Sequence, residues 1–178
     1  MTDEGLVLLV QNGNIEEYGK IVDRYKNKIA RYVGCLINQP IEEVEDITQE
    51  IFIKTYENIQ DFDRTKKFSS WIYRIAHNSC IDFFKKKKIK IQLRIDNEDY
   101  FESNEKLVED LEIQSEEKRA MKRAINKLDN NYREAILLYY YEDKSYGEIA
   151  DILKTNKSNV GVLLKRAKEK LKHVYIKK

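Results

Sequence analysis

The chain has 178 residues, of which 42% are hydrophobic, so it has room for one large or two small domains with packed cores. It contains no run of about 18 apolar residues and no signal-peptide pattern, so we expect neither membrane insertion nor secretion. The two cysteines, Cys35 and Cys80, are far apart in sequence and form no CxxC motif, which argues against a zinc site. These features predict a cytoplasmic protein with reduced thiols and without a metal or cofactor.

The net charge of +2 hides a strong segregation of charge along the chain. Residues 1–60 carry six Lys and Arg against eleven Asp and Glu, and residues 61–95 carry ten against three. Residues 96–117 then carry one against ten, and residues 118–178 carry sixteen against seven. Two basic blocks separated by an acidic one indicate two surfaces that bind polyanions, joined by a segment that repels them.

Helical periodicity dominates the first part of the chain, and no strand alternation or hairpin signal interrupts it. Residues 15–37 form an amphipathic run, Pro40 breaks it, and residues 41–59 resume with a second apolar stripe. Helices of this kind pack as an antiparallel bundle. Together with the stretch that follows, they predict one helical domain over residues 1–88.

That following stretch, residues 61–88, combines aromatic and basic side chains. A polar segment over residues 61–67 leads into a helix pattern, with Ser69 or Ser70 as its predicted N-cap. The helix ends in a run of four lysines, Lys85, Lys86, Lys87 and Lys88. Rings that stack on bases, edged by cations that follow the phosphates, are what a single-stranded nucleic acid requires. An ordinary aromatic core with a solvated helix end remains the alternative interpretation.

The acidic composition of residues 96–117 predicts a flexible linker, whose bounds are expected at residues 89–117, and helical patterns resume from Lys118. Residues 118–178 form the second predicted domain, in which residues 146–165 fit a helix-turn-helix with a Ser145 capping box and an Asn156 N-cap. Its second helix would place Lys157, Ser158, Asn159 and Gly161 near base edges, and Lys165, Arg166, Lys168 and Lys170 along phosphates. The fold class is therefore all-α: two small helical domains joined by an acidic linker. A plain helical hairpin is the alternative for this second domain.

Three motifs in this order give the chain a resemblance to a known family. The first is EDITQEIFIKTYENI at residues 45–59, and the other two are sets of single positions. The second set comprises Phe62, Phe68, Trp71, Ile75, Ala76, Asn78 and Asp82. The third comprises Leu128, Arg133, Tyr146 to Ala150, Val160, Leu164 to Ala167 and Leu171. Over nearly its whole length the chain resembles a bacterial RNA polymerase sigma factor of the small, extracytoplasmic-function type, which lacks a middle domain.

The resemblance implies a sigma factor that binds core RNA polymerase and directs initiation at promoters, under the control of an anti-sigma factor. It implies that Asp46, Gln49 and Glu50 contact the polymerase and that the second domain holds the −35 element as duplex. The residues implied in capturing the unpaired −10 strand, with the lysines that the charge pattern adds, are Arg64, Lys66, Lys67, Ser70, Trp71, Asn78 and Lys85 to Lys88. One departure concerns the recognition helix, which has Gly161 and Leu163 where the family usually carries Lys or Arg.

Other function classes fit less well. An enzyme is not expected, because the chain has no phosphate-binding glycine loop and no catalytic motif. His77 and His173 are far apart in sequence, and His77 is expected to be a partly exposed helix residue. A stand-alone helix-turn-helix repressor would leave the residue 45–59 motif unused. A protein–protein adaptor would leave the basic blocks unexplained.

Overall fold

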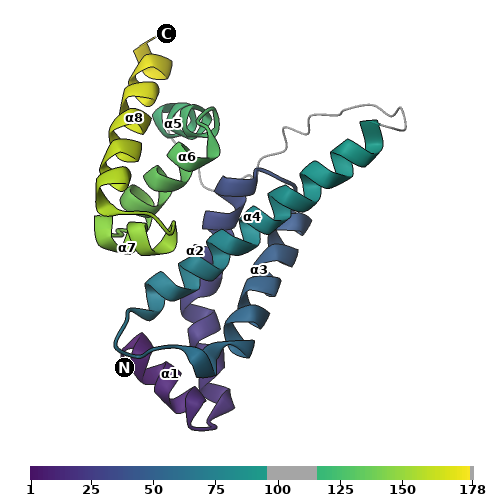
Figure 1. Cartoon of the computed structure of the whole chain (residues 1–178), viewed down its shortest axis with the longest axis vertical. Helices are drawn as coiled ribbons and strands as arrows, with labels where there is room; N and C mark the ends of the chain where they lie inside the picture. The colour runs from purple at the N-terminus through teal and green to yellow at the C-terminus, as the bar shows by residue number, and fades with distance from the viewer. Residues whose placement is uncertain (96–115, 177–178) are drawn as a thin grey trace. The chain divides into compact units, whose positions relative to one another are not determined.

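The computed structural model describes residues 1–95 and 116–176, and every regular element in these two ranges is helical. The chain divides into two compact units, Met1–Val108 and Glu109–Lys178. Figure 1 shows the helices of each unit. The all-α fold predicted from the sequence is confirmed.

The first unit is a bundle built around three long helices. Helices α2 and α3 pack against each other, α4 packs on both, and the short α1 lies against α2 and the start of α4 (Figure 1). The elements are α1 (Asp3–Gln11), η1 (Ile15–Glu17), α2 (Tyr18–Ile37), α3 (Ile41–Glu57), η2 (Ile59–Asp61) and α4 (Phe68–Ile95).

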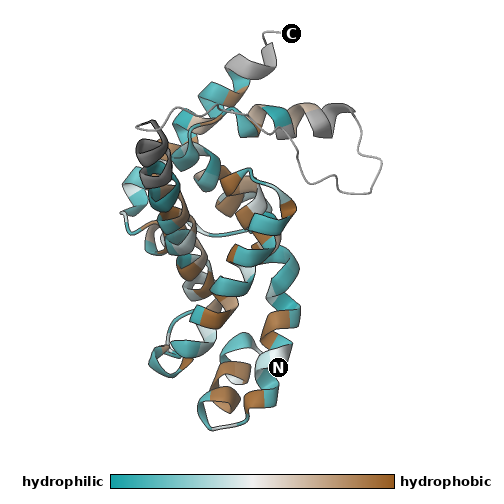
Figure 2. Cartoon of the chain, turned by 90° about the vertical axis from the view of Figure 1, so that its right-hand side faces the viewer, coloured by the Kyte–Doolittle hydropathy of each residue, from teal (hydrophilic) through white to brown (hydrophobic). Residues whose placement is uncertain are grey.

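The core of this unit follows the amphipathic patterns of the sequence. Hydrophobic and hydrophilic segments alternate along the helices in Figure 2, as expected for helices with one buried face. Asn38 ends α2 in the left-handed conformation, at φ 50°, and Pro40 precedes the first residue of α3. The fully buried side chains of the three long helices include Ile21, Ile29, Tyr32, Ile51, Phe68, Ile72 and Tyr73.

One local prediction for this unit was wrong, and one helix was not predicted. Helical periodicity was recognised only from Ile15 onward, yet residues 3–11 form α1, with the Thr2 hydroxyl accepting from the Gly5 N–H. Helix α4 begins at Phe68, so Ser69 and Ser70 lie inside it and neither is its N-cap. The acceptor that binds the Phe68 N–H is the side chain of Glu4, 64 residues away, which no local pattern could reveal.

The predicted boundary between the first domain and the linker also differs from the structure. Helix α4 continues seven residues beyond Lys88, to Ile95, because residues 89–95 contain good helix formers and neither Gly nor Pro. Helix α5 begins at Glu116, just before the expected start at Lys118. The rest of the predicted linker, residues 96–115, lies outside the described residues.

The second unit packs α6 and α7 against the long α8. Its elements are α5 (Glu116–Asn126), α6 (Asn130–Ile136), the π-helical η3 (Leu137–Tyr141), α7 (Tyr146–Ile152) and α8 (Lys157–Ile176). The buried guanidinium of Arg133 donates to the carbonyls of Asn126 and Leu128 at 2.6 and 2.9 Å. These two bonds hold the turn between α5 and α6.

The helix-turn-helix has the capping geometry that its sequence predicts. The Ser145 hydroxyl accepts from the Glu148 N–H, and the Glu148 carboxylate accepts from the Ser145 N–H at 2.9 Å, which completes the capping box. Asn156 caps α8 by accepting from the Asn159 N–H at 2.8 Å. Lys154, at φ 52°, makes the tight turn between the two helices.

Candidate nucleic-acid interface

The outer face of α3 carries the acidic and amide side chains that the sequence singled out. Asp46, Gln49 and Glu50 are all exposed, because the core-facing stripe of α3 lies on the opposite side of the helix. The Glu50 carboxylate forms an ion pair with Lys54 at 2.7 Å, and the Lys54 ammonium also reaches Ser79 of α4 at 3.2 Å. Glu50 is therefore held in place, while Asp46 and Gln49 project without such a constraint.

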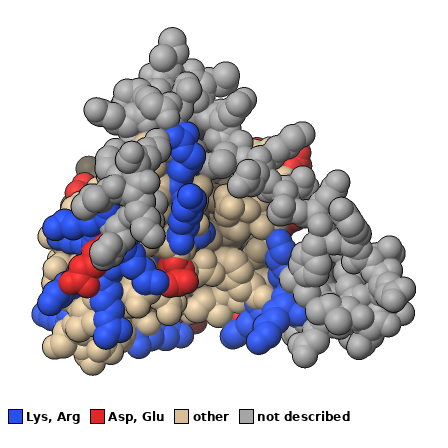
Figure 3. Space-filling model, turned by 90° about the horizontal axis from the view of Figure 1, so that it is seen from above, with Lys and Arg blue, Asp and Glu red and all other residues tan. Residues whose placement is uncertain are grey.

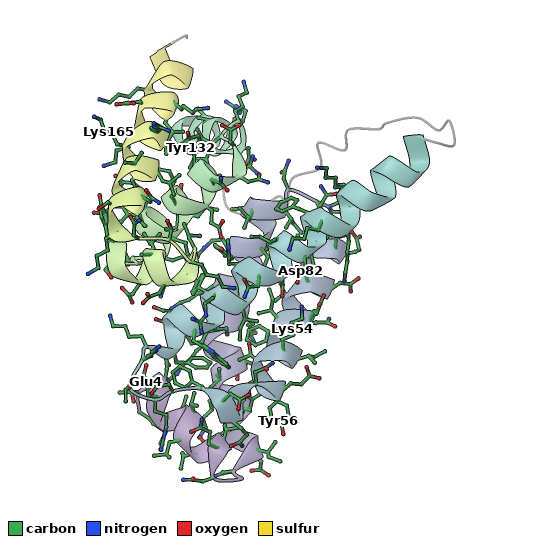
Figure 4. The ribbon with its side chains drawn as sticks, viewed as in Figure 1. Glu4, Lys54, Tyr56, Asp82, Tyr132 and Lys165 are labelled. Carbon is green, nitrogen blue, oxygen red and sulfur yellow. The ribbon has the colours of Figure 1, made fainter. Side chains whose placement is uncertain are left out.

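Two apolar side chains share this face, and the sequence interpretation missed them. Ile53 is 58% exposed, and Tyr56, in the last turn of α3 (Figure 4), is 39% exposed. The signal that could have revealed Ile53 is helical spacing, because Ile53 follows Asp46 by seven residues and Glu50 by three. An exposed apolar centre edged by polar groups is typical of a protein–protein contact surface.

The segment that joins η2 to α4, from Phe62 to Phe68, the first residue of α4, forms a tight and basic loop. The Asp63 carboxylate accepts from the Thr65 N–H at 3.0 Å and from the Thr65 hydroxyl at 2.7 Å. The Thr65 hydroxyl, followed by the Thr65 N–H, lowers the pKa of Asp63, so its carboxylate is ionised and can accept both hydrogen bonds at neutral pH. Arg64 and Lys66 are exposed on the turn, and Lys67 is exposed just before α4.

An aromatic cluster lies directly beneath this loop. The Trp71 ring is 5.1 Å from Phe62 and 5.6 Å from Phe68, centroid to centroid, and Phe68 is in edge contact with Tyr25 at 5.6 Å. Phe62 and Phe68 are buried, whereas Trp71 is half-buried. The Trp71 ring therefore packs on two buried rings, and part of its indole remains accessible to solvent.

Asn78 lies on the same side of α4 as Trp71, because seven residues make almost two complete turns. Asn78 is half-buried, as is Ser70. His77 differs from the expectation of partial exposure, since it is only 8% exposed. It follows Tyr73 by four residues and precedes Cys80 by three, so it belongs to the buried face of the helix.

The four lysines near the predicted end of α4 are not equivalent. Lys85, Lys86 and Lys88 are exposed, and Lys85 is only loosely paired with Asp82, at 3.6 Å. Lys87 is half-buried, and its ammonium donates to the Gln39 side chain at 2.7 Å while lying 5.8 Å from the Phe83 ring. Three of the four cations therefore project freely enough to meet a phosphate backbone.

The recognition helix α8 exposes the polar residues expected at its N-terminus and along its outer side. Lys157, Ser158 and Asn159 are exposed, although the Asn159 amide donates to Thr155 at 3.1 Å within the turn. Lys165, which projects from α8 in Figure 4, is also exposed. Exposed cations follow it at Arg166, Lys168 and Lys170.

Two of these cations have partners within their own domain. The Lys170 ammonium forms an ion pair with Asp129 at 2.8 Å and lies 4.9 Å from the Tyr132 ring. Lys168 lies 5.4 Å from the Tyr140 ring, and the Tyr140 hydroxyl raises the pKa of Lys168. Lys170 in particular braces α8 against the start of α6.

The structure also shows what stands beside Gly161. A Cβ built on Gly161 would lie 3.7 Å from the ring of Tyr146, so this tyrosine, the first residue of α7, covers the glycine. Tyr146 is 39% exposed, and Val162 is 46% exposed on the outer side of α8, opposite the buried Val160 and Leu164. The ring of Tyr146 thus covers Gly161, one of the two positions where the resemblance led us to expect a basic side chain.

Lys and Arg are more frequent than Asp and Glu on the face that Figure 3 presents. Within residues 1–95 and 116–176, no helix is both long and apolar enough to cross a membrane. The same part of the chain contains no group of three or more His, Cys, Asp or Glu arranged to hold a metal ion.

Two family models match the chain, one in each helical unit. The family model described as Sigma-70 region 2 matches residues 21–89, which include α3, the loop and most of α4. The model described as Sigma-70, region 4 matches residues 118–171, which include the helix-turn-helix. Together the two matches cover both helical units.

Two curated relatives match over almost the whole chain. The ECF RNA polymerase sigma factor SigW of Bacillus subtilis is 34% identical, with 92% of this chain and 91% of that protein covered. The ECF RNA polymerase sigma-E factor of Escherichia coli K12 is 30% identical, with 95% and 92% covered.

Two solved structures share the fold. The sigma factor RpoE of Bartonella quintana, solved with the anti-sigma factor NepR, has a TM-score of 0.77 at 18% identity and covers 90% of this chain and 97% of its own. CnrH, solved with the cytosolic domain of CnrY, has a TM-score of 0.71 at 22% identity and covers 97% and 96%. Because both family models match in order and both curated relatives are covered over more than 90% of their length, the chain belongs to the ECF RNA polymerase sigma factors.

Proposed function

We propose that the first unit docks on core RNA polymerase through the outer face of α3 and captures unpaired −10 bases with the 62–68 loop and α4. The second unit holds the −35 element as duplex DNA. The observation that carries this proposal is the position of Trp71, half-exposed on the buried rings of Phe62 and Phe68, beside a basic loop.

The −10 surface has the components that capture of a base requires. Extruding a base from duplex DNA costs a few kcal/mol, and stacking on an aromatic side chain returns about 1–3 kcal/mol per base. Trp71 supplies the ring, and Asn78 supplies amide groups that pair with a base edge. The cations that follow the strand are Arg64, Lys66, Lys67, Lys85, Lys86 and Lys88.

The α3 outer face suits a basic partner helix. Asp46, Gln49 and Glu50 offer carboxylate and amide acceptors to Arg or Lys side chains. The exposed Ile53 and Tyr56 supply the apolar area that gives such an interface its binding energy, with the acidic groups steering the encounter. The acidic charge of this face also keeps it away from DNA.

In the second unit, α8 enters the major groove with Lys157, Ser158 and Asn159 leading, while Lys165, Arg166 and Lys168 contact phosphates. Such a domain alone would describe a stand-alone repressor. That alternative is not favoured, because it gives no role to the first unit, which matches a sigma-factor region of its own.

We further infer that the protein acts in the cytoplasm as a non-catalytic initiation factor that needs no cofactor. An anti-sigma factor would hold it inactive by covering one or both binding surfaces. The sigma factor of Bartonella quintana described above was solved in complex with such an inhibitor.

Run-off transcription with purified core polymerase tests the proposed function. The template is the promoter region upstream of the protein's own gene, and the control is core polymerase alone. We expect a discrete transcript only when the protein is added. If the protein binds this promoter as a duplex but does not associate with core polymerase and yields no transcript, the repressor interpretation replaces ours.

A further inference from the structure

We propose that α1 acts as a bracket, meaning that it holds both ends of the 62–68 loop at a fixed separation. Glu4 and Gln11 are the positioning residues, and through the loop they determine where the Trp71 ring packs. The role of Trp71 in base capture rests on the proposed function. The bracket itself rests on hydrogen bonds from α1 to both ends of the loop.

Glu4 holds the end of the loop that enters α4. Its carboxylate accepts from the backbone N–H of Phe68 at 3.0 Å, and Phe68 is the first residue of α4. The first N–H groups of a helix have no partner within the helix, and a carboxylate there also meets the positive end of the helix dipole. Figure 4 shows Glu4 beside the segment that leads into α4. Glu4 therefore fixes where α4 begins.

Gln11 holds the beginning of the loop. Its side-chain amide donates to the Ile59 carbonyl at 2.8 Å and to the Phe62 carbonyl at 3.2 Å. In return, the Gln60 side chain donates to the Gln11 carbonyl at 3.4 Å. These bonds attach the C-terminal end of α1 to η2 and to the first residue of the loop.

The spacing of the two side chains makes α1 a rigid spacer. Seven residues separate Glu4 from Gln11, so both lie on one side of α1, about 10 Å apart along its axis at about 1.5 Å per residue. The helix itself is anchored because Leu6, Val7 and Val10 are buried.

Further bonds fix the N-terminal end of α1 to α2. The Asp3 carboxylate pairs with Arg24 at 2.7 Å and accepts from the Tyr25 hydroxyl. Burial, followed by this bond to Asp3, raises the pKa of Tyr25, so its hydroxyl remains a donor at any physiological pH. The Tyr25 ring in turn packs on Phe68 at 5.6 Å, which links the anchor to the aromatic cluster.

The residues at the two ends of the loop, Phe62 and Phe68, also supply the two rings that support Trp71. Phe62 and Phe68 contact each other at 5.5 Å, and each contacts Trp71. A change in the separation of the loop ends therefore moves Phe62 and Phe68, the two rings on which the Trp71 indole packs. Replacing Glu4 removes no buried side chain of α2, α3 or α4, so we expect the core of the bundle to remain folded.

Trp71 is the one tryptophan of the chain, so its fluorescence reports on the bracket without any DNA. The experiment measures acrylamide quenching of the full-length protein for the parent and for Glu4→Ala, Glu4→Gln and Gln11→Ala. Glu4→Gln keeps an oxygen acceptor at the same reach. The matched control is Glu16→Ala, because Glu16 is exposed in η1 and its side chain makes no hydrogen bond within the described residues.

We expect the quenching constant to rise by about twofold in Glu4→Ala and Gln11→Ala, while Glu4→Gln and Glu16→Ala match the parent. Circular dichroism confirms that each variant is folded at the temperature used. If Glu4→Ala does not fold, Gln11→Ala decides, since it acts on the other end of the loop. Parent-like quenching in both alanine variants would overturn the bracket.

Binding of a single-stranded −10 oligonucleotide, measured with core polymerase present, separates the bracket from the proposed function. We expect Glu4→Ala to bind this strand about five- to tenfold more weakly than the parent, with core affinity unchanged and Glu4→Gln restoring parental binding. If the parent itself does not bind the strand, the proposed function fails, and the quenching result still decides whether the bracket exists. A parent that binds, together with a Glu4→Ala variant of equal affinity, would show that the bracket has no part in capture.

Discussion

The ammonium of Lys87 donates a hydrogen bond to the Gln39 side chain at 2.7 Å, joining α4 to the turn between α2 and α3. The turn includes Asn38 in the left-handed conformation, followed by Gln39 and Pro40. Gln39 also donates its amide to the Asn38 carbonyl at 2.9 Å. Within the basic run, Lys87 thus stabilises the packing of the first unit, while Lys85, Lys86 and Lys88 are exposed to solvent.

This difference predicts unequal salt effects within the run. Replacing Lys86 or Lys88 by alanine should make the log–log salt dependence of promoter binding shallower by about 0.7–0.9 for each phosphate that the protein no longer neutralises. Lys87→Ala should leave that slope unchanged and lower the melting temperature instead. Salt titrations of holoenzyme binding to promoter DNA provide the slopes. A slope change for Lys87→Ala equal to that for Lys86→Ala would contradict the assignment.

The outer face of α3 should determine affinity for the polymerase without affecting stability. Asp46→Ala and Gln49→Ala should each weaken binding to core polymerase by more than about 1 kcal/mol, roughly fivefold. Because both side chains are exposed, unfolding free energies should change by less than about 0.5 kcal/mol. Asp23→Ala, an exposed acid of α2, is the matched control. Core affinity equal to that of the parent in the double variant would remove this face from the interface.

The exposed Val162 predicts that α8 reads a thymine methyl group. In the major groove, the C5 methyl of thymine is the apolar mark available to an aliphatic side chain. Replacing thymines of the −35 element one at a time by deoxyuridine should weaken binding at one position by about threefold, the value of burying about one methyl group. Val162→Ala should abolish that sensitivity. If no deoxyuridine substitution affects the parent, Val162 does not read the sequence.

The sequence predicted most of what depends on neighbours along the chain. The capping box at Ser145, the Asn156 cap and the break at Pro40 are set by residues within four positions of one another. The start of α4 was not predictable in this way. The side chain that caps it is Glu4, which comes close to the Phe68 N–H only after α1 has packed. Helix α1 is itself short and followed by a loop, so the sequence pattern did not predict it either.

In the candidate site, too, features set by nearby residues in the sequence were predictable, and features set by packing between helices were not. The spacing of Trp71 and Asn78 on one side of α4 could be derived from helical periodicity. The burial of His77 and the exposure of Tyr56 could not, because each lies at the edge of an apolar stripe, where the neighbouring helix decides which side is covered. The ring of Tyr146 over Gly161 depends on how α7 and α8 cross, which spacing alone does not specify.

The central claim is that the first unit opens promoter DNA by capturing unpaired −10 bases. Permanganate reactivity of −10 thymines, measured in complexes of core polymerase with the parent or with Asn78→Ala, tests it most directly. Asn78 is preferable to Trp71, whose removal would also leave a cavity beside Phe62 and Phe68 and cost about 3–5 kcal/mol. We predict strong reactivity with the parent and a large decrease with Asn78→Ala, while footprints over the −35 element remain equal. Absence of reactive thymines with the parent, or parent-like reactivity with Asn78→Ala, would contradict the assignment.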